Sequence, residues 1–107
     1  MADAPMVDRG PALPPGSAPY RTLGPFEGAT IPAGLLRQHD LKPGVWGILS
    51  VEAGTICFCW DDEAGGGRLL VAGDNMLIPP TVPHHLELRG QVVIAIAFWS
   101  PAAGGTA

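Results

Sequence analysis

Three histidines and two cysteines are the side chains of this 107-residue chain whose types and spacing suit metal binding or proton transfer. His84 and His85 directly follow a proline-rich corner, Pro79-Pro80-Thr81-Val82-Pro83. Proline fixes φ and donates no backbone hydrogen bond, so this corner ends one strand and holds the start of the next. A histidine positioned in this way suits a metal ligand or a general acid or base. His84 is therefore the first candidate site residue.

His39 is the second candidate, because it precedes the turn at Gly44 and would form a two-histidine nucleus with His84. Such a nucleus would hold a divalent metal ion (Zn, Fe, Mn or Ni), with water in the open coordination positions. On a regular strand His85 faces the side opposite to His84, and Glu87 shares the face of His85. We therefore add His85 and Glu87 as further candidates, with a solvated surface carboxylate as the simpler interpretation of Glu87.

Cys57 and Cys59 are the only two cysteines of the chain. Residues two apart on a strand share a face, with Cα atoms about 6.5–7 Å apart, at or past the limit for a disulfide. We expect both thiols to be reduced. If their face lines the interior, they would join His39 and His84 in a Cys2His2 set for Zn(II) or Cu(I) and offer a reactive thiol to oxidants. The alternative is that both are small buried hydrophobic residues.

Short apolar runs between glycine and proline corners must position these side chains, and this pattern predicts an all-β fold. The chain has 15 glycines and 12 prolines, spread along its length at places where strands are expected to end. We expect strands at 35–39, 45–51, 55–60, 68–71, 75–78, 84–88 and 92–99. Turns at Glu52-Ala53-Gly54 and Arg89-Gly90 would join neighbouring strands. Helix should be minor, so the predicted class is a small antiparallel β-barrel.

The last predicted strand is apolar on both faces. Val93, Ala95, Ala97 and Trp99 share one face, and the residues between them form the other. One face would fill the barrel, and the other would pack on a second layer or on a partner chain, which would make a homodimer. The small Ala95 and Ala97 leave room for a small-molecule pocket that Trp99 would border.

Composition excludes several partners. The net charge is −4 and the six basic residues are scattered singly, so nucleic acid is not an expected partner. No apolar run approaches the ~20 residues that span a membrane, and the acidic N-terminus is not a secretory signal. We expect a cytoplasmic protein with a disordered segment at 1–19, one barrel domain at 20–100 and a flexible tail at 101–107.

Four segments together resemble the single-domain cupins of the tellurite-resistance TehB/YeaR-like family. They are His39 to Gly47, Val51-Glu52-Ala53-Gly54, Ile78-Pro79-Pro80 and Pro83-His84-His85-Leu86-Glu87. The resemblance runs from about Pro32 to Trp99. It implies a cupin-like double-stranded β-helix, or jelly roll, a metal site between strands, and a role linked to tellurite or oxidant stress. The general cupin glutamate is missing, since Gly47 stands in its place, and the site is short of ligands.

Two functions from different classes follow. The first is a small cupin-type metal- and/or small-molecule-binding protein that works as a stress-response module without catalysis. The alternative is a metal-dependent cupin enzyme, of oxygenase or isomerase type, with His39 and His84 as ligands. A non-haem iron oxygenase normally needs two histidines and a carboxylate, and no interior carboxylate is evident, which favours the binding module. Histidines acting as acid and base without an ion are a third alternative.

Overall fold

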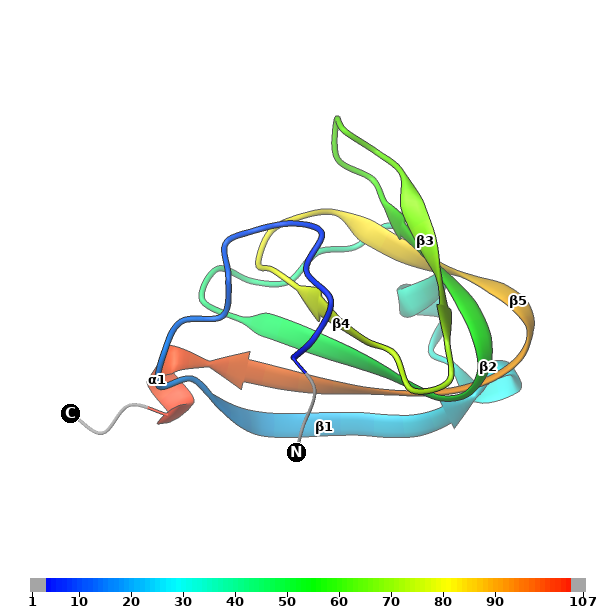
Figure 1. Ribbon diagram of the computed structural model, residues 1–107, viewed down its shortest axis with the longest axis horizontal. Helices are drawn as coiled ribbons and strands as arrows, with labels where there is room; N and C mark the ends of the chain where they lie inside the picture. The colour runs from blue at the N-terminus through cyan, green and yellow to red at the C-terminus, as the bar shows by residue number, and fades with distance from the viewer. Residues whose placement is uncertain (1–3, 105–107) are drawn as a thin grey trace.

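A computed structural model describes residues 4–104 and arranges five antiparallel strands in one bent sheet (Figure 1). The sheet order is β1-β5-β2-β3, and β4 pairs separately with β2. The elements in chain order are β1 (Ala18–Glu27), η1 (Gly28–Thr30), η2 (Ala33–Leu36), β2 (Trp46–Trp60), β3 (Gly67–Val71), β4 (Asn75–Ile78), β5 (His84–Ser100) and α1 (Pro101–Gly104). The predicted all-β class is confirmed, and helix is indeed minor.

Two long strands, β2 and β5, each replace a pair of strands that the sequence predicted. They pair along their whole length, from Trp46 opposite Trp99 to Trp60 opposite His84. The expected turn at Glu52-Ala53-Gly54 is instead a bulged bend, where the register shifts but β2 continues. The expected turn at Arg89-Gly90 likewise lies inside β5. These bends let each strand curve around the core instead of reversing, so the turn predictions at both places were wrong.

The predicted strand at 35–39 was also wrong. Residues Ala33–Leu36 form the short helix η2, and His39 makes only an isolated bridge with His84. Pro32 and Gly34 disfavour a regular strand here, and the adjacent Leu35 and Leu36 both pack against the core from the turn. The sequence pattern also missed β1, an edge strand whose residues are mostly exposed and show no apolar alternation.

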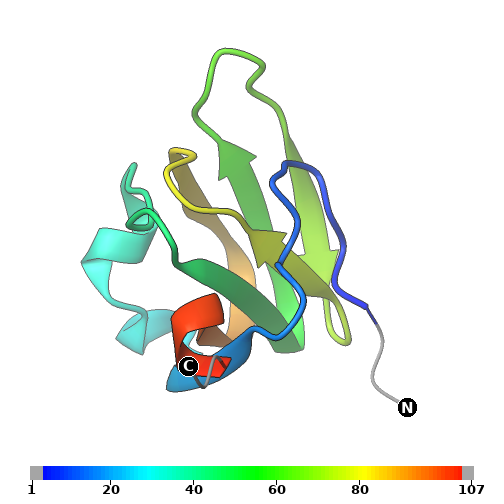
Figure 2. The same cartoon turned by 90° about the vertical axis from the view of Figure 1, so that its left-hand side faces the viewer.

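Residues 6–9 lie along β4 and the β2–β3 hairpin. Met6 accepts a backbone hydrogen bond from Leu77 at 2.9 Å and donates one to the Asn75 carbonyl at 2.7 Å. Arg9 binds the Asp62 carboxylate at 2.7 Å. In the view turned by 90°, this segment lies on one side of the molecule, and η1 and η2 lie on the other (Figure 2). The mobility of residues 1–19 stays a prediction, and residues 1–3 and 105–107 lie outside the described chain.

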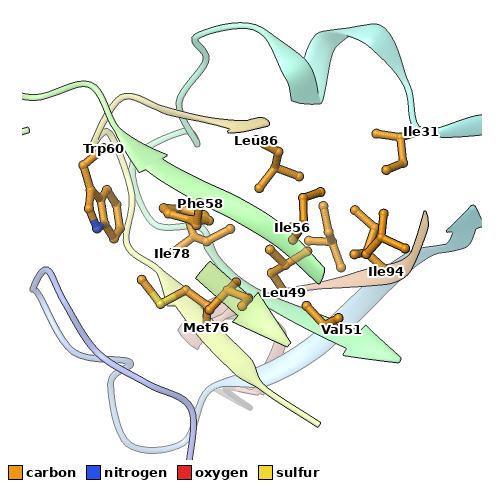
Figure 3. Packing of buried hydrophobic residues seen from close by; sticks show 13 residues of the cluster. Ile31, Leu49, Val51, Ile56, Phe58, Trp60, Met76, Ile78, Leu86 and Ile94 are labelled. Carbon is orange, nitrogen blue, oxygen red and sulfur yellow. The ribbon is translucent and has the colours of Figure 1, made fainter. Parts of the chain in front are cut away.

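The core fills the space between β2, β4 and β5 (Figure 3). Alternate residues of β2 and β5 point inward, which confirms the alternation predicted for the last strand, and Met76 and Ile78 from β4 close the opposite side. The cluster of buried hydrophobic residues is Ile31, Leu49, Val51, Ile56, Phe58, Trp60, Leu70, Met76, Ile78, Leu86, Val92, Ile94 and Ile96. His84 is the one buried polar or charged residue in the described part of the chain.

Among residues 4–104, no helix has the length and apolar character needed to cross a membrane.

Substitution of Gly54 tests whether β2 and β5 approach each other closely at the bend in β2. The φ of Gly54 is +74°, and an added Cβ would lie 1.9 Å from the Gln91 carbonyl oxygen of β5. A left-handed φ costs an alanine about 1–2 kcal/mol, and the clash adds to this, so Gly54→Ala should lower the free energy of unfolding by about 3 kcal/mol or more. Gly73, at φ +96° with open space around it, is the matched control. Urea denaturation measures both variants, and equal losses would contradict the close approach of the two strands.

Candidate functional site

The register of β2 on β5 separates the candidate residues into two groups on opposite faces. Inside the barrel, Phe58 lies opposite Leu86 and Trp60 opposite His84. On the outer face, Cys57 lies opposite Glu87 and Cys59 opposite His85. The two adjacent histidines therefore face opposite sides, as strand alternation predicted. The Cys2His2 set proposed from the sequence is wrong, because the sheet itself separates the thiols from His39 and His84.

The inner group is a pair of histidines. His39 and His84 exchange backbone hydrogen bonds of 3.0 and 2.9 Å, and their ring centroids are 4.3 Å apart in an edge-to-face arrangement. The His84 ring stacks on Phe58 at 5.3 Å and is 1% exposed. The sequence prediction that these two histidines meet is confirmed. The proline corner before His84 and the turn after η2 bring them together.

Both inner rings donate a hydrogen bond from Nδ1. The Nδ1 atom of His39 lies 2.8 Å from the Arg37 carbonyl oxygen, and that of His84 lies 2.8 Å from the Val82 carbonyl oxygen. A carbonyl only accepts, so each Nδ1 carries a proton and donates it. Burial lowers the pKa of His84 to about 4, so this ring is neutral at pH 7 and its Nε2 keeps a lone pair.

The inner pair does not fit the iron centre of a cupin oxygenase. Both rings line a cavity of about 10 Å³, which has room for about one water molecule. The rest of its described lining is apolar: Leu35, Leu49, Phe58, Ile78, Leu86 and Ile96. A divalent ion here would lose its water without gaining a carboxylate, and no substrate would fit beside it. The donor set therefore gives the enzyme alternative no support.

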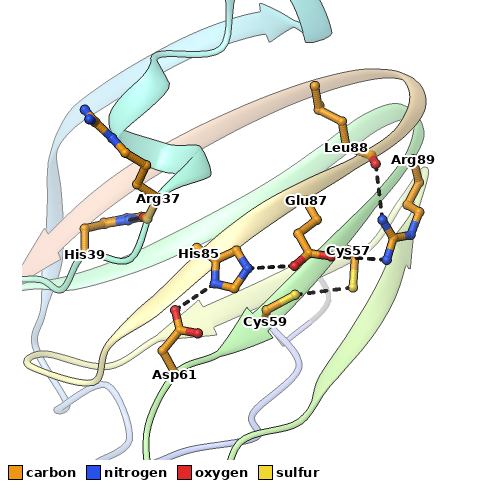
Figure 4. A network of polar contacts seen from close by, with 9 residues as sticks. All are labelled: Arg37, His39, Cys57, Cys59, Asp61, His85, Glu87, Leu88 and Arg89. Carbon is orange, nitrogen blue, oxygen red and sulfur yellow. Dashed lines mark hydrogen bonds and ion pairs between the residues drawn. The ribbon is translucent and has the colours of Figure 1, made fainter.

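The outer group, which we call the outer cluster, consists of Cys57, Cys59, Asp61, His85 and Glu87 (Figure 4). The two Sγ atoms lie 3.6 Å apart. Together with a carboxylate oxygen of Glu87 they form a set of three ligand atoms within 4.8 Å of one another. In residues 4–104 this is the only such group of three or more His, Cys, Asp or Glu side chains.

His85 joins two carboxylates of the outer cluster. Its Nδ1 lies 2.7 Å from Asp61 Oδ2, and its Nε2 lies 2.8 Å from Glu87 Oε2. These hydrogen bonds, the one to Asp61 first, raise the pKa of His85. Arg89 donates to the other oxygen of Glu87, Oε1, at 3.2 Å. Sequence reasoning missed Asp61, because its place directly after β2 gives no sign that the long strand pairing brings it beside His85.

The Cys59 thiol is protonated in the ion-free protein. Burial raises the pKa of Cys59 to about 12, and the neighbouring Cys57 and Glu87 add to the effect. Negative charge is unfavourable here because these groups already crowd one another. A cation reverses this balance, since it is attracted by the same groups and replaces their protons.

Two other features lie apart from both groups. Trp99 lies opposite Trp46 at the far end of β5, and its indole N–H is buried with no hydrogen-bond partner in the described residues. A groove of about 730 Å³ lies at the bends of β2 and β5 beside η1, with Glu27, Gly54 and Leu88 in its lining. The lining that residues 4–104 provide includes neither Trp99 nor another predicted site residue.

The bent antiparallel sheet defines a small cupin-like β-barrel protein. It carries two groups of polar side chains, the inner histidine pair and the outer cluster. Residues 21–96 match the family model described as the TehB-like domain, which covers most of the chain. The protein therefore belongs to the TehB-like domain family. No curated protein sequence matches it.

Solved structures show the same fold. TehB from Haemophilus influenzae superposes with a TM-score of 0.72 at 20% identity, over 78% of this chain and 31% of TehB. This chain thus spans about a third of that protein. A protein from E. coli strain K12 superposes with a TM-score of 0.74 at 27% identity, over 84% of this chain and 96% of its own. The iron(II) form of HppE superposes more distantly, with a TM-score of 0.50 at 21% identity, over 59% of this chain and 34% of HppE.

The buried His84 predicts a dependence of stability on pH. Its pKa is about 4 in the folded chain and 6.5 when unperturbed, so the unfolded chain binds more protons between these values. The stabilisation is complete above about pH 6.5 and is lost as the pH falls through 4, with a total of about 3 kcal/mol. Urea denaturation of ion-free protein from pH 7.5 to 4 measures this loss. His84→Gln should flatten the profile and His39→Gln should keep it, whereas equal slopes in wild type and His84→Gln would contradict the assignment.

Proposed function

We propose that this TehB-like protein is a metal-binding module that holds a thiophilic divalent ion, with Zn²⁺ as the reference ion, at the outer cluster. The observation that carries the proposal is the set of three donor atoms from Cys57, Cys59 and Glu87 within 4.8 Å. They come from two paired strands of the sheet, so their spacing is set by backbone hydrogen bonds rather than by a loop.

The spacing of the thiols supports a tetrahedral ion. Two sulfurs at Zn–S distances of about 2.3 Å in a tetrahedron lie about 3.8 Å apart. The Sγ atoms of Cys57 and Cys59 lie 3.6 Å apart before any ion is bound. An ion would therefore enter with little movement of either side chain, which reduces the cost of ordering the site.

The exposure of the outer cluster supports exchange of the ion with solvent. The Glu87 side chain is 44% exposed and that of His85 21%, so an ion reaches the cluster without opening the barrel. Binding needs thiolates, so uptake of the ion releases protons and strengthens as the pH rises. Reduced thiols are maintained in a compartment such as the cytoplasm, which is where we expect this function to operate.

Binding without catalysis is favoured over the enzyme alternative. The outer cluster lies on a sheet face, whereas a substrate-sized site is normally a cleft that buries most of its ligand. A role in tellurite or oxidant stress rests on the family resemblance, and half-buried thiols beside a carboxylate suit capture of a soft ion in such a role. The homodimer and a small-molecule ligand stay predictions.

The proposal is tested with untagged full-length protein that is reduced, stripped with a chelator and titrated with Zn²⁺. We expect one ion per chain by mass spectrometry. Cys57→Ser and Cys59→Ser should each weaken binding by more than about 100-fold, because loss of a ligand exceeds the 10- to 100-fold effect of an outer-shell partner. Serine nearly preserves the side-chain shape, and circular dichroism checks the fold.

His39→Ala is the matched control, since it removes a donor from the inner pair and leaves the outer cluster intact. Substoichiometric uptake by the wild-type chain, or full uptake by both serine variants, would overturn the proposed site. Loss of the ion in His39→Ala alone would move it to the inner pair.

A further inference from the structure

We propose that His85 is the fourth ligand of the ion and that Asp61 is its positioning residue. The outer cluster would then close as a tetrahedral site of two sulfurs, one carboxylate oxygen and one imidazole nitrogen. This inference rests on the proposed function and deepens it, because a closed set of four ligands fixes the class of ion and leaves no position for a substrate.

The position of His85 supports its role as a ligand. It is the cross-strand partner of Cys59, and Cys57 is the partner of Glu87, so the four side chains occupy two adjacent pairs on one face. The His85 Nε2 atom lies 2.8 Å from Glu87 Oε2 and is thus directed at a carboxylate of the three-donor set (Figure 4). In the ion-free chain His85 lies outside the set of three donors within 4.8 Å, so its ring would turn Nε2 from the Glu87 carboxylate toward the ion on binding.

Asp61 fixes the other side of the ring. Its Oδ2 accepts the Nδ1–H of His85 at 2.7 Å, and its own backbone N–H donates to the Pro83 carbonyl at 2.8 Å. A ligand histidine typically donates its second ring nitrogen to a carboxylate or a carbonyl, which fixes the tautomer and the ring orientation. Asp61 provides this arrangement, so that Nε2 is the nitrogen left for the ion.

Arg89 completes the arrangement around Glu87. Its guanidinium donates to Oε1 at 3.2 Å, while Oε2 faces His85. Oε2 is therefore the oxygen that is available to the ion. When the ion enters, the Nε2–H proton of His85 and both thiol protons leave to solvent, and the Nδ1–H proton stays on His85, hydrogen-bonded to Asp61.

The donor set defines the class of ion. Two sulfurs, a nitrogen and one oxygen in a tetrahedron suit Zn²⁺ and Co²⁺. Mg²⁺ and Ca²⁺ require six or more oxygen ligands, so neither should compete for this site. The outer cluster would therefore retain a transition ion in the presence of excess Mg²⁺.

Co²⁺ titration of the reduced full-length chain tests the inference, because its visible absorption reports sulfur ligation and tetrahedral geometry separately. Wild type should show both signals. His85→Ala should keep the sulfur charge-transfer band, lose the intensity of the tetrahedral bands and bind more than about 100-fold more weakly, because a ligand is lost. Asp61→Asn should weaken binding in the same direction by about 10-fold. With ¹¹³Cd²⁺ in place of Zn²⁺, ¹⁵N NMR spectra of wild type should show a coupling between the ion and His85 Nε2, which a purely structural role would not produce.

Matched controls are His39→Ala, for loss of a histidine outside the outer cluster, and Glu52→Gln, for loss of an exposed carboxylate on β2. Both should bind Co²⁺ as wild type does. His85→Gln, which retains hydrogen-bonding capacity, replaces His85→Ala should the latter fail to fold. If wild type takes up no Co²⁺, the proposed function itself fails. If uptake depends on Cys57 and Cys59 but the His85 and Asp61 variants keep wild-type affinity and spectrum, the proposed function stands and the four-ligand site is overturned.

Discussion

The pairing of β2 with β5 is the interaction on which the rest of the structure depends. These two strands run together from Trp46 opposite Trp99 to Trp60 opposite His84, and every other strand joins one of them. Because side chains alternate along a strand, a slip of one residue would exchange the inner and outer faces of either strand. The buried Phe58 and Leu86 hold this register, since a slip would place the polar neighbours of Leu86 in the core.

The same register creates two chemical environments within a few residues of each other. His84 lies inside, where burial keeps its ring neutral, and the next residue, His85, lies outside between two carboxylates, which favour its charged form. The inner face favours neutral groups because burial removes them from the bulk water that would solvate a charge. The outer face can collect thiols and carboxylates because it is half-exposed. Charged metal-binding chemistry is therefore expected on the outside of this barrel rather than at its centre.

This arrangement differs from the one that the cupin resemblance implies. A cupin-like metal site would lie inside the barrel, and His39 and His84 do meet there, but their cavity is apolar apart from the two rings. The interior of this chain is packed by leucine, isoleucine and phenylalanine side chains from β2, β4 and β5, and they leave space for about one water molecule. The fold is thus shared with cupin-type proteins, while the donor groups that could hold a transition ion lie on the opposite face of the sheet.

The sequence by itself determined the class of fold, the alternation of faces in β2 and β5, the bounds of β4 and the meeting of His39 with His84. These features follow from local rules, namely side-chain alternation and the stiffness of a proline corner. Only the tertiary structure decided that both long strands continue through Gly54 and Gly90, because a glycine permits a bend as readily as a reversal. It also decided which face of β2 is buried, and it brought Asp61 to His85. Both depend on pairing between segments more than 20 residues apart, for which no local pattern in the chain carries the information.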